Sequence, residues 1–115
     1  MNTDKTEYQQ KAEELTKQLG SKVHAIVFAI PGSDDKIVGY VKEPDFITKL
    51  RWTDAYFAGS GYTMGNNLYD ALLVKDQTDV RLYDTGNPDN QKYVMGGIKY
   101  LTDLVQIALP EIKKN

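Results

Sequence analysis

KVHAIVFAI (residues 22–30) is followed by PGSDDK (31–36), IVGYVKEP (37–44) and DFITKLRWTDAYF (45–57). The first stretch contains an apolar run of strand length, and the second carries the proline, glycine and aspartates typical of a turn. The third predicts a second strand that ends at Pro44, and the short connection favours an antiparallel hairpin. Asp45 after the proline predicts the start of a helix. This order of elements predicts an α+β fold.

The strands are expected over 23–30 and 37–41, and helices flank them. The first helix is expected over 5–19, because Asp4 and Glu7 resemble a capping box and Tyr8, Ala12, Leu15 and Leu19 follow at helical spacing. A third helix, capped by Thr63, would turn Met64, Leu68, Ala71 and Leu72 to the core. The last would begin at Asp89 or Asn90 and carry the apolar residues Tyr93, Val94, Ile98, Leu101, Leu104, Val105 and Ala108. We therefore expect a hairpin packed by three to four helices, with one more short strand at 79–83.

The helix that follows Asp45 has apolar residues on more than one side. Phe46, Leu50 and Phe57 share one face, which we expect to pack against the apolar strand. Trp52 and Tyr56 lie off that face. Large aromatic side chains outside a core often mark protein interfaces, although a second layer of the same chain would also cover them.

The overall composition limits the classes of protein. The chain has 115 residues, which suits one domain over residues 1–115, and 41% of them are hydrophobic. With no cysteine and a net charge of −2, the chain offers no disulfide framework or thiolate, and it makes a poor partner for nucleic acid. A polar start and the lack of a long apolar run predict no signal peptide and no membrane span. We expect a cytoplasmic protein.

The sequence contains no recognisable catalytic or metal-binding constellation. His24 is the single histidine, and no nucleophile motif accompanies it. The glycines around Ser60 follow a predicted helix rather than a strand, so they do not fit a nucleotide-binding loop. The spacing of Asp76, Asp79 and Asp84 does not fit a calcium loop. We expect no catalytic residue, no metal and no cofactor.

A protein-binding role is the remaining prediction, with Trp52, Tyr56, Gly96 and Gly97 as its candidate residues. The two aromatic residues would contact the partner, and the paired glycines would allow another backbone to approach the last helix or would bend it. The partner could be another protein or a second copy of this chain. A small-ligand-binding or regulatory domain, with a pocket between the hairpin and the second helix, is the alternative.

Residues 36–45 (KIVGYVKEPD), 68–76 (LYDALLVKD) and the final amphipathic helix resemble a group of small tailed-phage proteins. These are described as tail-assembly-chaperone-like, and the shared near-motif is Tyr40-x-Lys42-x-Pro44-Asp45. The chain departs from the pattern in RLYD (81–84) and in its paired glycines. The resemblance implies a non-enzymatic protein that binds phage structural proteins during assembly, in the host cytoplasm or in the virion. It supplies no catalytic residues.

Overall fold

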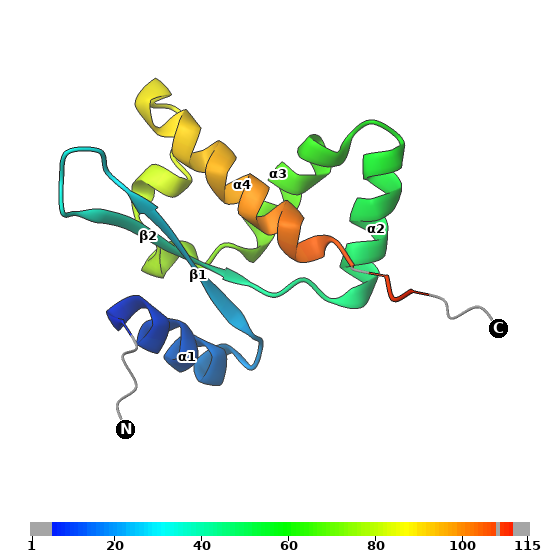
Figure 1. Ribbon diagram of the computed structural model, residues 1–115, viewed down its shortest axis with the longest axis horizontal. Helices are drawn as coiled ribbons and strands as arrows, with labels where there is room; N and C mark the ends of the chain where they lie inside the picture. The colour runs from blue at the N-terminus through cyan, green and yellow to red at the C-terminus, as the bar shows by residue number, and fades with distance from the viewer. Residues whose placement is uncertain (1–5, 108, 112–115) are drawn as a thin grey trace.

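The computed structural model describes residues 6–107 and 109–111 of the chain (Figure 1). Within this range a two-stranded antiparallel sheet combines with four α-helices and three short 3-10 helices, which confirms the predicted α+β class. The elements follow in the order α1 (Glu7–Leu19), β1 (Val23–Ala29), β2 (Lys36–Lys42), α2 (Phe46–Phe57), α3 (Gly61–Leu72), η1 (Lys75–Gln77), η2 (Val80–Leu82), η3 (Pro88–Asn90) and α4 (Gln91–Val105).

The first helix is capped differently from the prediction. Asp4 lies outside the described residues, and the capping box is formed by Thr6 and Gln9 instead. The Thr6 hydroxyl accepts a hydrogen bond from the Gln9 backbone N–H, and the Gln9 side chain accepts one from the Thr6 N–H. Gly20, with φ 71°, ends the helix in the left-handed conformation that glycine adopts without strain. The predicted element is therefore confirmed, with a later start.

The start of α3 also differs from the prediction, and α4 differs only in how its first residue is capped. Thr63 does not cap α3, which begins at Gly61 directly after Ser60. Asn90 occupies the N-cap position of α4, as predicted, but its side chain makes no capping hydrogen bond there, and together with Asp89 it belongs to η3. The side chain of Asn87 caps that short helix by accepting a hydrogen bond from the Asp89 N–H.

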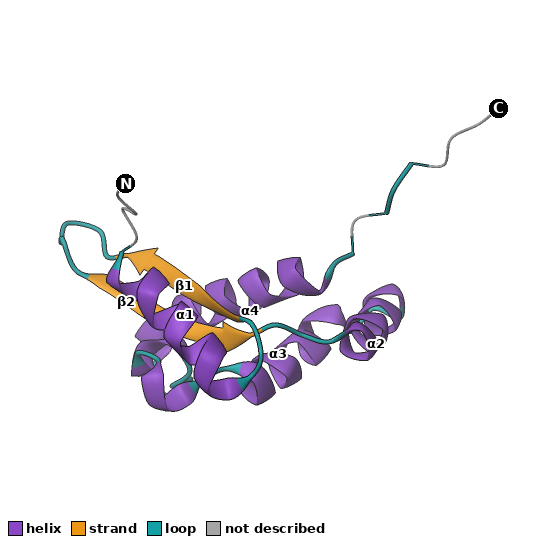
Figure 2. Cartoon of the chain, turned by 90° about the horizontal axis from the view of Figure 1, so that it is seen from below, coloured by secondary structure: helices purple, strands orange, loops and turns teal. Residues whose placement is uncertain are grey.

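Helix α1 lies against one face of the hairpin, and α3 and α4 lie against the other, as Figure 1 and Figure 2 show together. The register of the hairpin pairs Val23 with Lys42 and Phe28 with Ile37. On one face, α1 packs Ala12 and Leu15 against the sheet. The other face contacts α3, α4 and the short helices. This arrangement explains why β1 is apolar on both faces.

Among the described residues, two clusters of buried apolar side chains lie one on each face of the hairpin. The larger consists of Ile26, Val41, Tyr69, Leu73, Val94, Ile98 and Leu101. The smaller consists of Ala12, Leu15, Val23 and Tyr40. Within α3 the prediction was partly wrong, because Ala71 is exposed and the residues buried on that helix are Gly61, Gly65 and Tyr69.

Residues 79–83 do not form the predicted strand. Val80–Leu82 is a 3-10 helix, capped by the Asp79 side chain, and Leu82 is fully buried. The segment before it already lies along the outer edge of β2, where the Val74 N–H donates to the Tyr40 carbonyl and the Asp79 N–H to the Val38 carbonyl. After Asp79 the chain leaves this edge and turns into the 3-10 helix. This turn directs Leu82 into the core.

Candidate protein-binding surface

Helix α2 is held at both ends by local hydrogen bonds. The Asp45 carboxylate accepts the Thr48 N–H at 2.8 Å, as the sequence predicts. The hydrogen bonds from Thr48 hold the pKa of the Asp45 carboxyl below its usual value. At the other end the Ser60 N–H donates to the Ala55 carbonyl and the Gly59 N–H to the Tyr56 carbonyl, which is the pattern of a Schellman motif. Glycine is needed there because its φ is 88°.

Trp52 is the residue that joins α2 to the rest of the molecule. It is 5% exposed, and its indole N–H donates to the Gly61 carbonyl at 3.1 Å. The Tyr56 ring stacks on the indole with 5.2 Å between the ring centroids. A Cβ at position 61 would lie 3.0 Å from Cδ2 of Tyr56, so a glycine fits this contact best. Of the two alternatives left open for Trp52, the structure shows the second, in which another layer of the same chain covers it.

The opposite side of α2 exposes the residues that were expected to be buried. Phe46 is 61% exposed, Leu50 43% and Phe57 82%. The segment after α4 adds Ile107 and Leu109, which are 43% and 85% exposed. We call these five residues the α2 surface. The predicted packing of Phe46, Leu50 and Phe57 against the hairpin is wrong, because α2 packs through its other side against α3 and α4 (Figure 1).

The α2 surface borders an open groove of about 550 Å³. Its lining is mostly apolar and consists of Phe46, Leu50, Trp52, Thr53, Tyr56, Phe57, Gln106, Ile107 and Leu109. Burial of such side chains stabilises a contact by about 25 cal/mol for each Å² of apolar surface removed from water. The chemistry of this groove therefore suits an apolar ligand or an apolar protein segment.

An ionic cluster links the hairpin to α2. The Glu43 carboxylate contacts His24 Nε2 at 2.6 Å and Lys49 Nζ at 2.9 Å. Burial raises the pKa of Glu43, but the hydrogen bonds from Lys49 and His24 outweigh it and hold that pKa below its usual value. Tyr100 lies close enough for the Glu43 charge to add to burial in raising the pKa of its phenol.

This cluster explains the isolated histidine as a structural residue. Its Nε2 is occupied by Glu43, and no serine or threonine hydroxyl bonds to the ring among the described residues. Over residues 6–107 and 109–111, no group of acidic or histidine side chains is placed to bind a metal. The structure gives local roles to two residues of the stretches that were weighed for a cation or a nucleotide, because Asp79 caps η2 and Gly59 ends α2.

The four predicted binding residues do not form one surface. Tyr56 is exposed beside the groove, whereas Trp52 lies beneath it. Gly97 is buried, and Gly96 is half-buried against the Phe28 ring of β1. The glycines do permit a close approach, but the groups that approach are side chains of the same chain.

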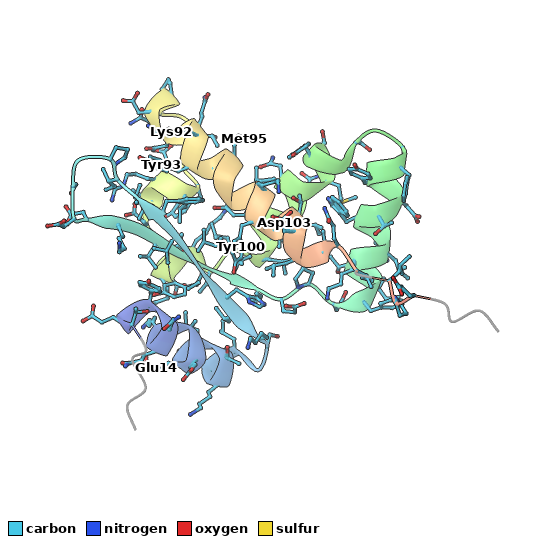
Figure 3. All side chains as sticks on the ribbon, in the orientation of Figure 1. Glu14, Lys92, Tyr93, Met95, Tyr100 and Asp103 are labelled. Carbon is cyan, nitrogen blue, oxygen red and sulfur yellow. The ribbon has the colours of Figure 1, made fainter. Side chains whose placement is uncertain are left out.

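The rest of α4 shows the same division between a covered and an open side. Tyr93 and Tyr100 lie on the side of the helix that faces the hairpin, and Met95 lies away from it (Figure 3). The Tyr93 ring lies 6.2 Å from that of Phe28, and Met95 is exposed.

Sequence reasoning missed Phe46, Leu50 and Phe57 as surface residues, and Ile107 and Leu109 altogether. The available signal was that α2 carries large apolar residues on opposite sides, which a helix at the border of a small domain cannot bury together. Periodicity could not tell which side would be covered.

No family model, curated protein sequence or solved structure matches this chain. In the part of the chain that the structure describes, no helix is both long and apolar enough to cross a bilayer.

Proposed function

We propose that this protein is a non-enzymatic protein-binding module that acts as a phage assembly chaperone or a small virion-associated protein. The α2 surface is its docking site, and the occupant is an apolar segment of a phage structural protein. The observation that carries the proposal is the gathering of exposed apolar side chains from α2 and from the segment after α4.

Exposed apolar surface of this kind is unfavourable in water unless a partner covers it. Phe57 and Leu109 present nearly their whole side chains, and neither is needed to complete the core. The resemblance of residues 36–45 and 68–76 to tail-assembly-chaperone-like proteins supports the same class of function.

Co-expression with the products of the reading frames that flank its gene tests the proposal. We expect one of those products to co-purify with the wild-type protein and to be lost, at least about tenfold, with the double variant Leu50→Ser/Phe57→Ser. That loss corresponds to about 1.4 kcal/mol, less than a single interface anchor often contributes.

The matched control is Met95→Ser, which changes an exposed apolar residue on α4 outside the α2 surface. This variant should retain the partner. The proposal is wrong if no flanking product binds, or if both variants retain the partner equally.

The second candidate function, a small-ligand-binding domain, is favoured by the volume of the groove alone. About 550 Å³ lies within the range of small-molecule sites, although those sites usually enclose their ligand more fully. Native mass spectrometry of freshly purified protein distinguishes the two functions. An apolar ligand that co-purifies with the wild-type protein and is absent from the double variant would favour the second.

A further inference from the structure

The backbone of the segment after α3 pairs with the outer edge of β2, whereas the outer edge of β1 has no such neighbour among the described residues. The register of the hairpin shows which backbone groups of β1 point to that outer edge. The Glu43 N–H donates to the Lys22 carbonyl at 2.8 Å, so positions 22 and 43 form a hydrogen-bonded pair. Because such pairs alternate along an antiparallel ladder, Ile26 and Phe28 also direct their N–H and C=O groups to β2. The odd-numbered residues of β1 direct theirs to the outer edge.

One end of that outer edge is closed by α1. The Val23 N–H points outward, as the alternation requires, and donates to the Thr16 hydroxyl at 2.9 Å. Thr16 in turn donates to the Ala12 carbonyl, which fixes the hydroxyl in place. Within the part of the chain that the structure describes, α1 therefore occupies the backbone edge of β1 at its first residue only.

Beyond this point the edge is open. The outward N–H and C=O groups of Ala25, Val27 and Ala29 have no hydrogen-bond partner among the described residues. None of the three residues is buried. In Figure 1, β1 lies in front of β2, with α1 below it and α4 above it, and Figure 2 shows β1 along the upper border of the hairpin. A strand edge of uncharged residues without proline invites another strand to pair with it.

A groove of about 660 Å³ runs between α1 and this edge. The residues at its apolar base are Tyr8, Ala12, Val23 and Ala25. At the Val23 end its rim carries Lys17 and Lys22, which are exposed and form no ion pair with the described residues.

We propose that an extended segment of a partner protein adds to β1 as an antiparallel third strand, in a site separate from the α2 surface. The residues of this segment that pair with β1 have uncharged side chains. The C-terminal end of the segment carries a carboxylate that contacts Lys17 and Lys22. Each outward pair along Ala25, Val27 and Ala29 exchanges two backbone hydrogen bonds with the segment. We favour a lone segment over a second copy of the chain as the occupant. A single strand needs only about 4.8 Å of space beside β1, whereas a second copy would also have to place its own α1 and α4 near this edge.

The first test uses the acetylated peptide TVTVTVTEE and amide hydrogen exchange of the full-length protein, measured by NMR. In the free protein we expect the amides of Ala25, Val27 and Ala29 to exchange fast and those of Ile26 and Phe28 slowly. Saturating peptide should slow the first three by about tenfold or more, which corresponds to about 1.4 kcal/mol of added protection. Unchanged exchange at these positions at millimolar peptide would overturn the proposal.

The second test changes the backbone donor and keeps a matched control. Val27→Pro removes an outward N–H, and we expect it to weaken peptide binding by about tenfold. Val27→Ala shortens the same side chain but keeps the N–H, and should bind within about threefold of the wild type. Equal binding by both variants would contradict strand addition.

The third test modifies only the probe, so it does not depend on the folding of a variant. N-methylation of the peptide at all its valines, or at all its threonines, blocks the donors on one side of the strand. One of the two peptides should lose binding and the other should keep it. The peptide TVTVTVTKK should bind more weakly than TVTVTVTEE at low salt. Equal effects of the two methylation patterns, or no preference for glutamate, would overturn the assignment.

A second copy of the chain as the occupant would give a different result. The protein alone would then show a concentration-dependent dimer in light scattering that Val27→Pro abolishes, and the lone-segment proposal would be wrong. Leu50→Ser/Phe57→Ser should leave peptide binding unchanged, which separates this site from the proposed function.

Discussion

Trp52 and Phe57 are aromatic residues of the same helix in opposite environments. Trp52 is covered by α3 and α4 and has a hydrogen-bond partner for its indole N–H. Phe57 makes a T-shaped contact with the Tyr56 ring and is 82% exposed. The two residues should therefore differ sharply in their contributions to stability.

Trp52→Ala should lower the free energy of unfolding by about 3–5 kcal/mol, as truncation of a buried aromatic side chain does. Phe57→Ala should change it by no more than about 0.5 kcal/mol, as expected at an exposed position. Urea denaturation followed by circular dichroism measures both. A larger loss for Phe57→Ala than for Trp52→Ala would contradict the placement of α2.

Glu43 predicts a pH dependence of stability. Its pKa is lower in the folded protein than the ordinary value of 4.5, so the native state binds fewer protons than the unfolded state in acid. The stabilising contribution is therefore present above pH 4.5 and is lost as the pH falls through the folded pKa. We expect the free energy of unfolding to fall less steeply in this acidic range for Glu43→Gln than for the wild type. Parallel curves from denaturant titrations between pH 6 and pH 3 would exclude this role.

At the scale of the elements, Gly96 and Gly97 fit α4 against two other elements. A Cβ at position 97 would lie 2.7 Å from Cζ of Tyr69, whose hydroxyl donates to the Leu82 carbonyl and holds the ring in place. A Cβ at position 96 would meet Cζ of Phe28, also at 2.7 Å. The Phe28 ring is only half-buried and can move aside, whereas Tyr69 cannot.

Gly97→Ala should therefore destabilise the protein by about 1–3 kcal/mol, the usual cost of overpacking. Gly96→Ala should be close to neutral, because alanine gains about 1 kcal/mol of helix propensity over glycine and so offsets the displacement of Phe28. Urea midpoints of the two variants provide the comparison, with each glycine as the control for the other. A Gly97→Ala protein that is more stable than Gly96→Ala would disprove this packing.

At the scale of the whole molecule, the hairpin holds together two unequal layers. The layer of α3 and α4 packs against the larger apolar cluster. Helix α2 belongs to this layer, because it contacts both α3 and α4. On the other face α1 rests on the smaller cluster and contacts chiefly β1. Segments with fewer buried contacts open at lower free energy than the rest of a protein.

We therefore expect α1 to undock without global unfolding. Native-state hydrogen exchange should give a lower opening free energy for the α1 amides than for those in the middle of α4. Leu15→Ala, which removes a buried side chain from the smaller cluster, should widen this difference. Equal opening free energies for α1 and α4 in both proteins would show that the two layers unfold as one unit.

The amino-acid sequence by itself determined the local elements of this protein. A proline or glycine beside an aspartate, and alternation or helical spacing of apolar residues, are properties of neighbouring residues. For that reason the hairpin, the Asp45 cap, the end of α2 at Gly59 and the α+β class follow from short stretches. The extended prediction for 79–83 was wrong because the four-residue island there is too short for periodicity to decide between a strand and a 3-10 helix.

Only the tertiary structure decided which side of each element is covered. Helix α2 has Trp52 on one side and Phe46, Leu50 and Phe57 on the other, and local propensity is equally satisfied by either orientation. The choice depends on distant residues, because the Gly61 carbonyl accepts the indole N–H while the hairpin is already covered by α4 and α3. The open edge of β1 depends in the same way on where 73–79 and α1 lie. The exposed apolar face and the unpaired edge are therefore properties of the assembled fold, which no single stretch of sequence encodes.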